Sequence, residues 1–120
     1  MNKEVGEFVL TLLHAATNSH ILHLRTKLYP QHVALGEFYA ALPDLVDGLA
    51  ESIQGLTEEL IDYPEEYFPP IVDPLEELQF LKQYVREERK ELPQESEIQN
   101  AVDEIATLIN QTIYKIKFLK

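Results

Sequence analysis

Apolar side chains recur every three or four residues along four long stretches of the chain, which is the spacing of one face of an α-helix. The stretches cover about residues 3–27, 30–54, 73–91 and 96–119. Each is longer than the average globular helix, and the four are similar in length. No segment has the pattern of a strand, an internal repeat or a low-complexity tract. The pattern predicts a single all-α domain over residues 1–120, folded as a four-helix bundle.

Proline and glycine mark the ends of the first two predicted helices. Tyr29-Pro30 ends the first helix, because a proline disfavours helical geometry in the residue before it and suits the first turn of the next helix. Gly55 is a natural stop for the second helix. Pro43 lies in the middle of that helix and removes a backbone hydrogen bond there, so we expect it to kink or divide the helix.

The second half of the chain contains two helix starts and a long connection. Asp73 is suited to be the N-cap of the third helix, with Pro74 at the first helical position. Ser96 and Gln99 have the spacing of a capping box at the start of the fourth helix. The connection, residues 56–72, contains prolines that exclude a long helix and aromatic residues that predict packing across the bundle. It either closes a hairpin or crosses the length of the bundle.

The charge balance bears on the partners of the protein. The chain has 21 acidic and 10 basic side chains and a formal net charge of −11. Nucleic-acid binding needs a concentrated basic surface, and the only basic cluster is Lys115, Lys117 and Lys120, which argues against a nucleic-acid partner. We expect no membrane partner either, because the longest apolar run, residues 8–16, is interrupted by polar side chains and too short to cross a bilayer.

Two absences indicate where the protein works. The chain contains no cysteine, which excludes disulfides, thiolate metal sites and a cysteine nucleophile. The first residues lack the basic region, apolar stretch and cleavage site of a secretory signal. We therefore expect a soluble cytoplasmic protein.

Histidines and carboxylates recur at helical spacing in the first half of the chain. On the first predicted helix, His20 and His23 continue the apolar stripe, so both are expected to face the core. On the second helix, His32 begins the inward stripe, and Asp47 and Glu51 lie on the line beside it. Four residues are roughly one helical turn, so these two carboxylates project from one face of the helix.

Imidazoles and carboxylates at such spacing are the ligands that a first-row metal site in a helical bundle needs. The predicted metal ligands are His20, His23, His32, Asp47 and Glu51. The ordinary structural interpretation is that the histidines are packed, hydrogen-bonded residues and that the carboxylates form a solvated acidic face. The pattern indicates a site without naming a reaction.

The stretch from residue 17 to residue 55 resembles the Dps-like miniferritins, a branch of the ferritin-like superfamily. His20 and His32 have the twelve-residue spacing of the histidines of that family, and Asp47 and Glu51 keep both their mutual spacing and their distance from His32. The stretch is also similar to short ferritin-like proteins of unassigned function encoded by bacteriophages. The resemblance implies a ferritin-like four-helix bundle with iron as the metal.

It further implies that the iron site is shared across a two-fold interface, with histidines from one subunit and carboxylates from the other. The protein would then self-associate to at least a homodimer, and the family activity would be Fe(II) oxidation by peroxide or oxygen, a ferroxidase reaction.

Two departures from the family pattern affect this prediction. Gly36 stands where the family has an acidic ligand, and the neighbouring Glu37 is turned about 100° away around the helix. The local sequence around the first family histidine is matched by His23, three residues after His20, so either histidine is the counterpart.

Three hypotheses follow. The first is an oligomeric iron-binding protein, and the second is a metal-free ferritin-like structural or interaction protein with a degenerate site. The third is a helical adaptor whose resemblance to the miniferritins is coincidental.

Overall fold

The computed structural model describes residues 3–70 and 73–120, and these residues form helices and no strand. The elements are α1 (Lys3–Arg25), α2 (Tyr29–Thr57), α3 (Pro74–Glu88), the short 3₁₀ helix η1 (Arg89–Glu91) and α4 (Ser96–Phe118). The predicted all-α class with four main helices is confirmed. None of the described helices is both long and apolar enough to cross a membrane.

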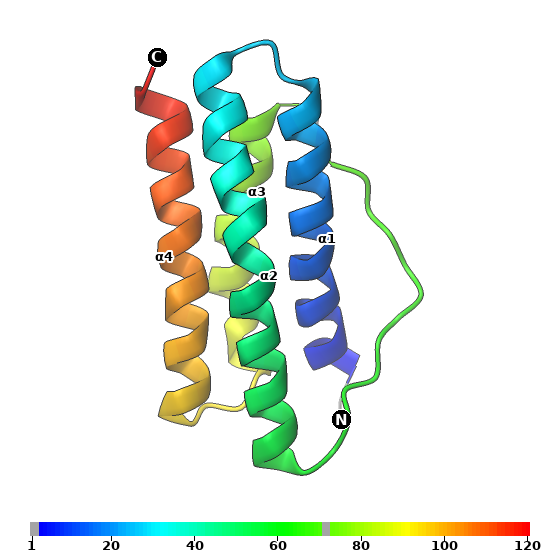
Figure 1. Ribbon diagram of the computed structural model, residues 1–120. Coiled ribbons are helices and arrows are strands. Elements are labelled where there is room, and N and C mark those ends of the chain that lie inside the picture. Colours follow the sequence, from blue (N-terminus) through cyan, green and yellow to red (C-terminus); the bar gives the residue numbers. More distant parts are fainter. Residues whose placement is uncertain (1–2, 71–72) are drawn as a thin grey trace.

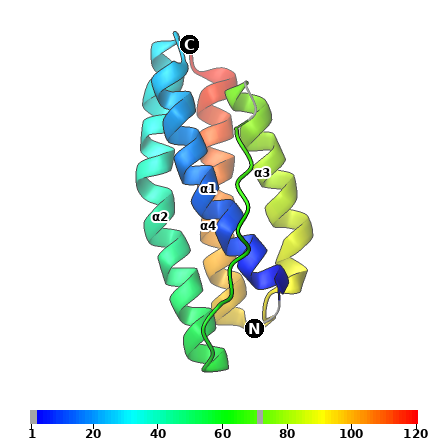
Figure 2. The ribbon, with the colours of Figure 1, turned by 90° about the vertical axis from the view of Figure 1, so that its right-hand side faces the viewer.

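The long connection between α2 and α3 decides the topology of the bundle. Its described part, residues 58–70, is here called the strap, and it runs along the outside of α1 from one end of the bundle to the other (Figures 1 and 2). The connection therefore crosses the length of the bundle instead of closing a hairpin. As a result α2 and α3 run in the same direction, and α1 and α4 run opposite to them.

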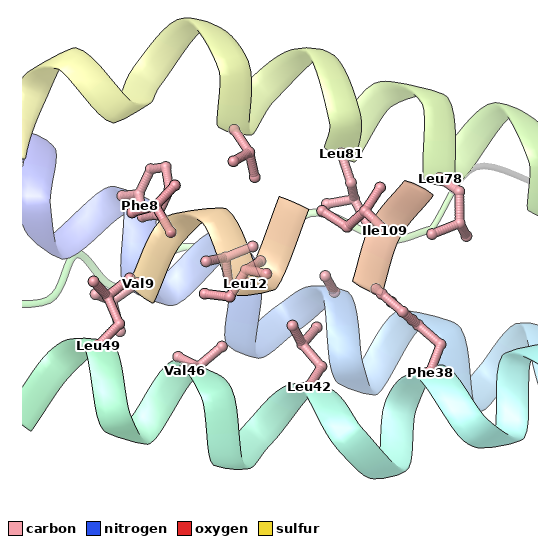
Figure 3. Packing of buried hydrophobic residues seen from close by; sticks show 14 of the residues in the cluster. Phe8, Val9, Leu12, Phe38, Leu42, Val46, Leu49, Leu78, Leu81 and Ile109 are labelled. Atoms are coloured by element: carbon pink, nitrogen blue, oxygen red, sulfur yellow. The ribbon is translucent and has the colours of Figure 1, made fainter. Parts of the chain in front are cut away.

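The core lies between the four helices (Figure 3). Each helix contributes aliphatic side chains, and α1 and α2 also contribute Phe8 and Phe38. Phe8, Phe38, Leu42, Leu81 and Ile109 are among its members and are at most 2% exposed. Burial of each such side chain contributes about 1.5–3 kcal/mol to the free energy of unfolding before the entropy cost of folding is subtracted. The helical periodicity of the sequence thus translates into one continuous core.

The second helix is longer and more regular than its prolines and glycines predict. It passes through Gly55 and ends at Thr57, where Glu58 takes a left-handed conformation (φ 58°) and donates its N–H to the carbonyl of Gln54. The predicted stop at Gly55 was therefore wrong. Pro43 lies inside α2 without dividing it, because the loss of one backbone hydrogen bond is outweighed by the packing of the buried face on which the helix rests.

Of the two predicted helix starts, one is confirmed. Asp73 is the N-cap of α3, and its carboxylate accepts a hydrogen bond from the N–H of Glu76 at 3.2 Å. The capping box at α4 is wrong, because Ser96 is already the first helical residue and the N-cap is Glu95, which forms no side-chain cap. The side chain of Gln99 instead donates to backbone carbonyls of the α3–α4 corner.

The strap packs against α1 at two points. Near the start of α1 the backbone of Asp62 passes so close to Gly6 that a β-carbon there would lie 1.8 Å from the Asp62 carbonyl oxygen. Further along, the amide of Asn18 donates to the carbonyl of Phe68 at 2.9 Å and accepts from the hydroxyl of Tyr67 at 2.7 Å. Packing of this connection onto the bundle, predicted from its aromatic residues, is confirmed.

Candidate metal centre

The predicted histidines gather at the end of the bundle where α1 turns into α2. His20 and His23 occupy the last two turns of α1, and His32 lies in the first turn of α2. Only three residues, 26–28, separate the two helices, so α2 folds back directly onto the end of α1 (Figure 1). This short turn brings His32 against His23.

His23 and His32 form a reciprocal pair. The Nδ1 atom of His23 lies 2.6 Å from the backbone oxygen of His32, and the Nδ1 atom of His32 lies 2.9 Å from the backbone oxygen of His23. The two rings are stacked, with centroids 3.7 Å apart and planes 17° from parallel. Because a carbonyl oxygen only accepts, each Nδ1 carries the proton, and in the neutral ring each Nε2 is left with a free lone pair.

The pair also has a structural role. The carbonyl of His23 belongs to the last turn of α1, where carbonyls have no partner within their own helix. The His32 imidazole supplies that partner, so it closes the α1–α2 turn. The two half-buried rings therefore stabilise the turn whether or not they bind a metal.

His20 lies differently from the prediction. Its side chain is exposed instead of facing the core, because the buried face of this part of α1 passes through Ser19 and Leu22. The His20 ring stacks on Tyr39 of α2, with centroids 4.0 Å apart and an interplanar angle of 8°. Its centroid is 6.1 Å from that of His23. His20 thus borders the reciprocal pair without belonging to it.

Asp47 and Glu51 lie one turn apart on one face of α2, as their spacing predicted, and both side chains are exposed. They lie fifteen and nineteen residues after His32 on one uninterrupted helix, which corresponds to about 22 Å and 28 Å along its axis. The carboxylates and the histidines of one chain therefore form two separate groups. Within the described part of the chain, no three histidine, aspartate or glutamate side chains are gathered so that they could hold a metal ion.

A neighbouring ring lies against Gly36, the position at which the resemblance to miniferritins led us to expect an acidic ligand. A β-carbon built on Gly36 would lie 3.0 Å from Cε1 and 3.2 Å from Nδ1 of His23. The adjacent acid, Glu37, points toward α4, where its carboxylate accepts from the ammonium group of Lys115 at 2.6 Å. Gly36 thus permits the close approach of His23, and Glu37 does not replace the missing ligand.

Two contacts around the histidines had no counterpart in the sequence pattern. The stacking of His20 on Tyr39 and the pairing of Glu37 with Lys115 each join residues from different helices. Spacing along one helix carries no information about such contacts, because they depend on how the helices are placed side by side.

Comparison with known proteins identifies the family of the chain. The model of a family of unknown function (DUF5856) matches residues 23–116, which is more than half of the chain, so the chain belongs to this family. The matched region includes His23, His32, Asp47 and Glu51 and begins after His20. No curated protein and no solved structure matches the chain.

Proposed function

We propose that this member of the DUF5856 family is a ferritin-like protein that binds and oxidises Fe(II) at a site shared between two copies of the chain. His23 and His32 of one copy provide the nitrogen ligands, and Asp47 and Glu51 of the other copy provide the carboxylates. His20 lies beside the site. Iron is the substrate in this proposal, and peroxide or oxygen is the oxidant.

The order of the helices supports the ferritin-like assignment. The bundle has one long connection, which crosses its length between α2 and α3, while the other two connections are short. A four-helix bundle with a single crossover is the arrangement of ferritin-like folds.

The observation that carries the proposal is the reciprocal histidine pair. Histidine ligands of metals ordinarily donate their second ring N–H to a carbonyl or carboxylate, which fixes the tautomer and the direction of the ring. Here the Nδ1–H groups of His23 and His32 are both held by carbonyls. Two Nε2 lone pairs at one end of the helix pair are therefore available for a cation.

The separation of the two ligand groups supports a shared site. Asp47 lies about 22 Å from His32 along α2 and is turned only about 60° from it around the helix. If two copies pack α2 against α2 in opposite directions about an axis near Ala40, His32 of one copy faces Asp47 of the other. Ala40 is exposed and small, and it is turned about 80° from His32, beside Asp47 on the same face, which permits the helices to approach closely.

The donor set fits iron in both oxidation states. Neutral imidazoles suit the ferrous ion, and carboxylates suit the harder ferric ion. The electron lost by each Fe(II) passes to the oxidant, and the protein would contribute binding and orientation.

A second candidate function, a metal-free ferritin-like interaction protein, is favoured by one observation. The imidazole of His23 lies against Gly36, the position at which the miniferritins have an acidic ligand. In this candidate the histidine pair only closes the α1–α2 turn, and Asp47 and Glu51 are a solvated acidic face. The two candidates share one fold and differ in iron chemistry.

The decisive experiment mixes two inactive variants. Neither His32→Ala nor the double variant Asp47→Asn/Glu51→Gln is expected to oxidise Fe(II), whereas the control Glu97→Gln, an exposed acid on α4, is expected to retain activity. Fe(II) is added anaerobically, peroxide is admitted and ferric absorbance is recorded. Co-refolding the two inactive variants in equal amounts should restore about a quarter of the wild-type activity, because half of the dimers are mixed and each contains one intact site.

Other results would contradict the proposal. Mixing that restores nothing, although sedimentation shows mixed dimers, would mean that the site is not shared. A wild-type chain that sediments as a monomer, or that yields no ferric absorbance above buffer, would leave the metal-free interaction protein as the supported function.

A further inference from the structure

A cavity of about 580 Å³ lies between α1, α3 and the strap, away from the histidine pair. Figure 2 shows the strap passing over the space between these two helices. The volume lies within the range of small-molecule sites, about 300–1,000 Å³. The cavity therefore has room for a ligand of ten or so non-hydrogen atoms.

The walls of the cavity combine aromatic rings with acids. Phe80 and Tyr84 from α3 and Phe68 from the strap provide aromatic surface. Glu66 from the strap and Glu7 from α1 are also part of the lining, and the Glu7 carboxylate lies 3.7 Å from the ammonium group of Lys3. The buried Glu77 of α3 completes the acids, and no lysine or arginine is among the described lining residues. Aromatic faces and carboxylates both attract cations, so the electrostatics of the walls select a positively charged ligand with an apolar body.

The pKa of Tyr84 reports on the electrostatics of one wall. Burial raises the pKa of the Tyr84 hydroxyl above its ordinary value of 10.0, its hydrogen bond with Thr11 lowers it by less, and the negative charges of Glu88 and Glu7 raise it further. The last two causes agree with a negative potential at this wall.

We propose that this cavity binds an organic ammonium ion of the arylalkylamine class, with the ring among Phe68, Phe80 and Tyr84 and the ammonium group toward Glu66 and Glu7. The assignment is independent of the iron chemistry, because none of the lining residues belongs to the histidine and carboxylate groups on the α1–α2 side.

The test uses three probes of similar shape and different charge. They are 2-phenylethylammonium, the neutral 2-phenylethanol and the anion 3-phenylpropanoate, each titrated into the ¹⁵N-labelled full chain. The ammonium probe should shift amide resonances of α1 around His14 and of the strap. It should bind up to about fivefold more tightly than the alcohol, which is the contribution of a partly exposed ion pair, and the anion should be the weakest.

Variants at the walls separate charge from shape. Glu66→Gln should lower the affinity for the ammonium probe by up to about fivefold and leave the affinity for the alcohol unchanged, because only the ion pair is lost. Phe80→Ala, at a side chain that is 49% exposed and so tolerates truncation, should weaken both probes. Glu76→Gln, an exposed acid on the same helix outside the lining, is the matched control and should change neither.

The result that would overturn the proposal is equal affinity for the ammonium probe and the alcohol. Resonance shifts away from α1, α3 and the strap, or the absence of binding at millimolar probe, would also overturn it. Iron oxidation is measured separately, so failure of this proposal is distinguishable from failure of the shared iron site.

Discussion

The contact between Gly6 and the strap allows a quantitative prediction about the crossover. Gly6 is buried in the first turns of α1, and it does not have a positive φ, so its backbone conformation accepts an alanine. A β-carbon there would lie 1.8 Å from the carbonyl oxygen of Asp62 and 2.9 Å from its carbon. Because real β-carbons essentially never come closer than 3.0 Å, the strap must move by about 1.2 Å to accept Gly6→Ala.

The expected cost follows from two opposing effects. Forcing an extra methyl group into a packed region costs about 1–3 kcal/mol. Replacing glycine by alanine within a helix gains up to about 1 kcal/mol, and less here because Gly6 lies near the start of α1. We therefore expect Gly6→Ala to lower the free energy of unfolding by about 1–2 kcal/mol.

A matched control replaces a glycine by alanine at a position where no other atom obstructs the new methyl group. Gly48 is exposed in the middle of α2, and a β-carbon there meets no atom within 4 Å. Gly48→Ala should therefore raise the free energy of unfolding by about 0.5–1 kcal/mol through helix propensity alone. The two substitutions are predicted to have opposite signs.

Urea denaturation followed by far-ultraviolet circular dichroism measures both changes. Hydrogen exchange of residues 58–70 shows whether Gly6→Ala loosens the strap or the whole bundle. If Gly6→Ala stabilises the protein as much as Gly48→Ala does, the strap does not pass close to α1 at this point and the packing described for it is wrong.

Three further predictions concern the core, a buried hydroxyl and the α3–α4 corner. Phe38→Ala, at a fully buried side chain, should cost about 3–5 kcal/mol in urea denaturation, and a smaller loss would indicate a loosely packed core. Burial raises the pKa of Tyr84 above 10.0 in the folded state. The stability that its neutral hydroxyl contributes is therefore fully present below pH 10 and is lost as the pH rises through the pKa of the folded state. An absorbance titration should show a late-ionising tyrosine that disappears in Tyr84→Phe. Arg89→Lys should cost about 1–2 kcal/mol, because a lysine cannot reproduce the guanidinium contacts to Gln99 and Asp103, and equal urea midpoints would contradict this.

The helices were predictable because their periodicity records which face is buried. Leu12, Leu42, Val46 and Ile105 are among the apolar residues whose spacing of three or four predicted the helices, and all are at most 1% exposed. The stripe of α1 was misplaced only near its end, where His20 was expected inside and is exposed. There the apolar pattern gives way to polar residues, so the sequence no longer distinguishes the two neighbouring faces.

Helix ends and the course of the strap were less predictable. Glycine is typical of helix ends, but α2 continues through Gly55 to Thr57. No neighbouring atom lies close enough to Gly55 to obstruct the helix there. Ser96 and Gln99 have the spacing of a capping box. The Gln99 side chain instead accepts a hydrogen bond from the Arg89 guanidinium group and donates one to the Arg89 carbonyl. The direction of the strap depends on its contacts with α1, such as that at Asn18, which are remote in sequence.

The spacing of histidines and carboxylates along one chain was not enough to predict how they are arranged in the candidate site. The sequence left His20 and His23 as alternatives, and the distinction between them comes from the α1–α2 turn, which brings His32 against His23 and leaves His20 on Tyr39. Asp47 follows His32 by fifteen residues, and on a continuous helix this spacing places the two groups about 22 Å apart. One chain therefore cannot bring them onto one ion, and only association with a second copy can make the spacing functional. Spacing along a single chain does not encode the oligomeric state. That state decides whether the histidines take part in an iron site or only stabilise the α1–α2 turn.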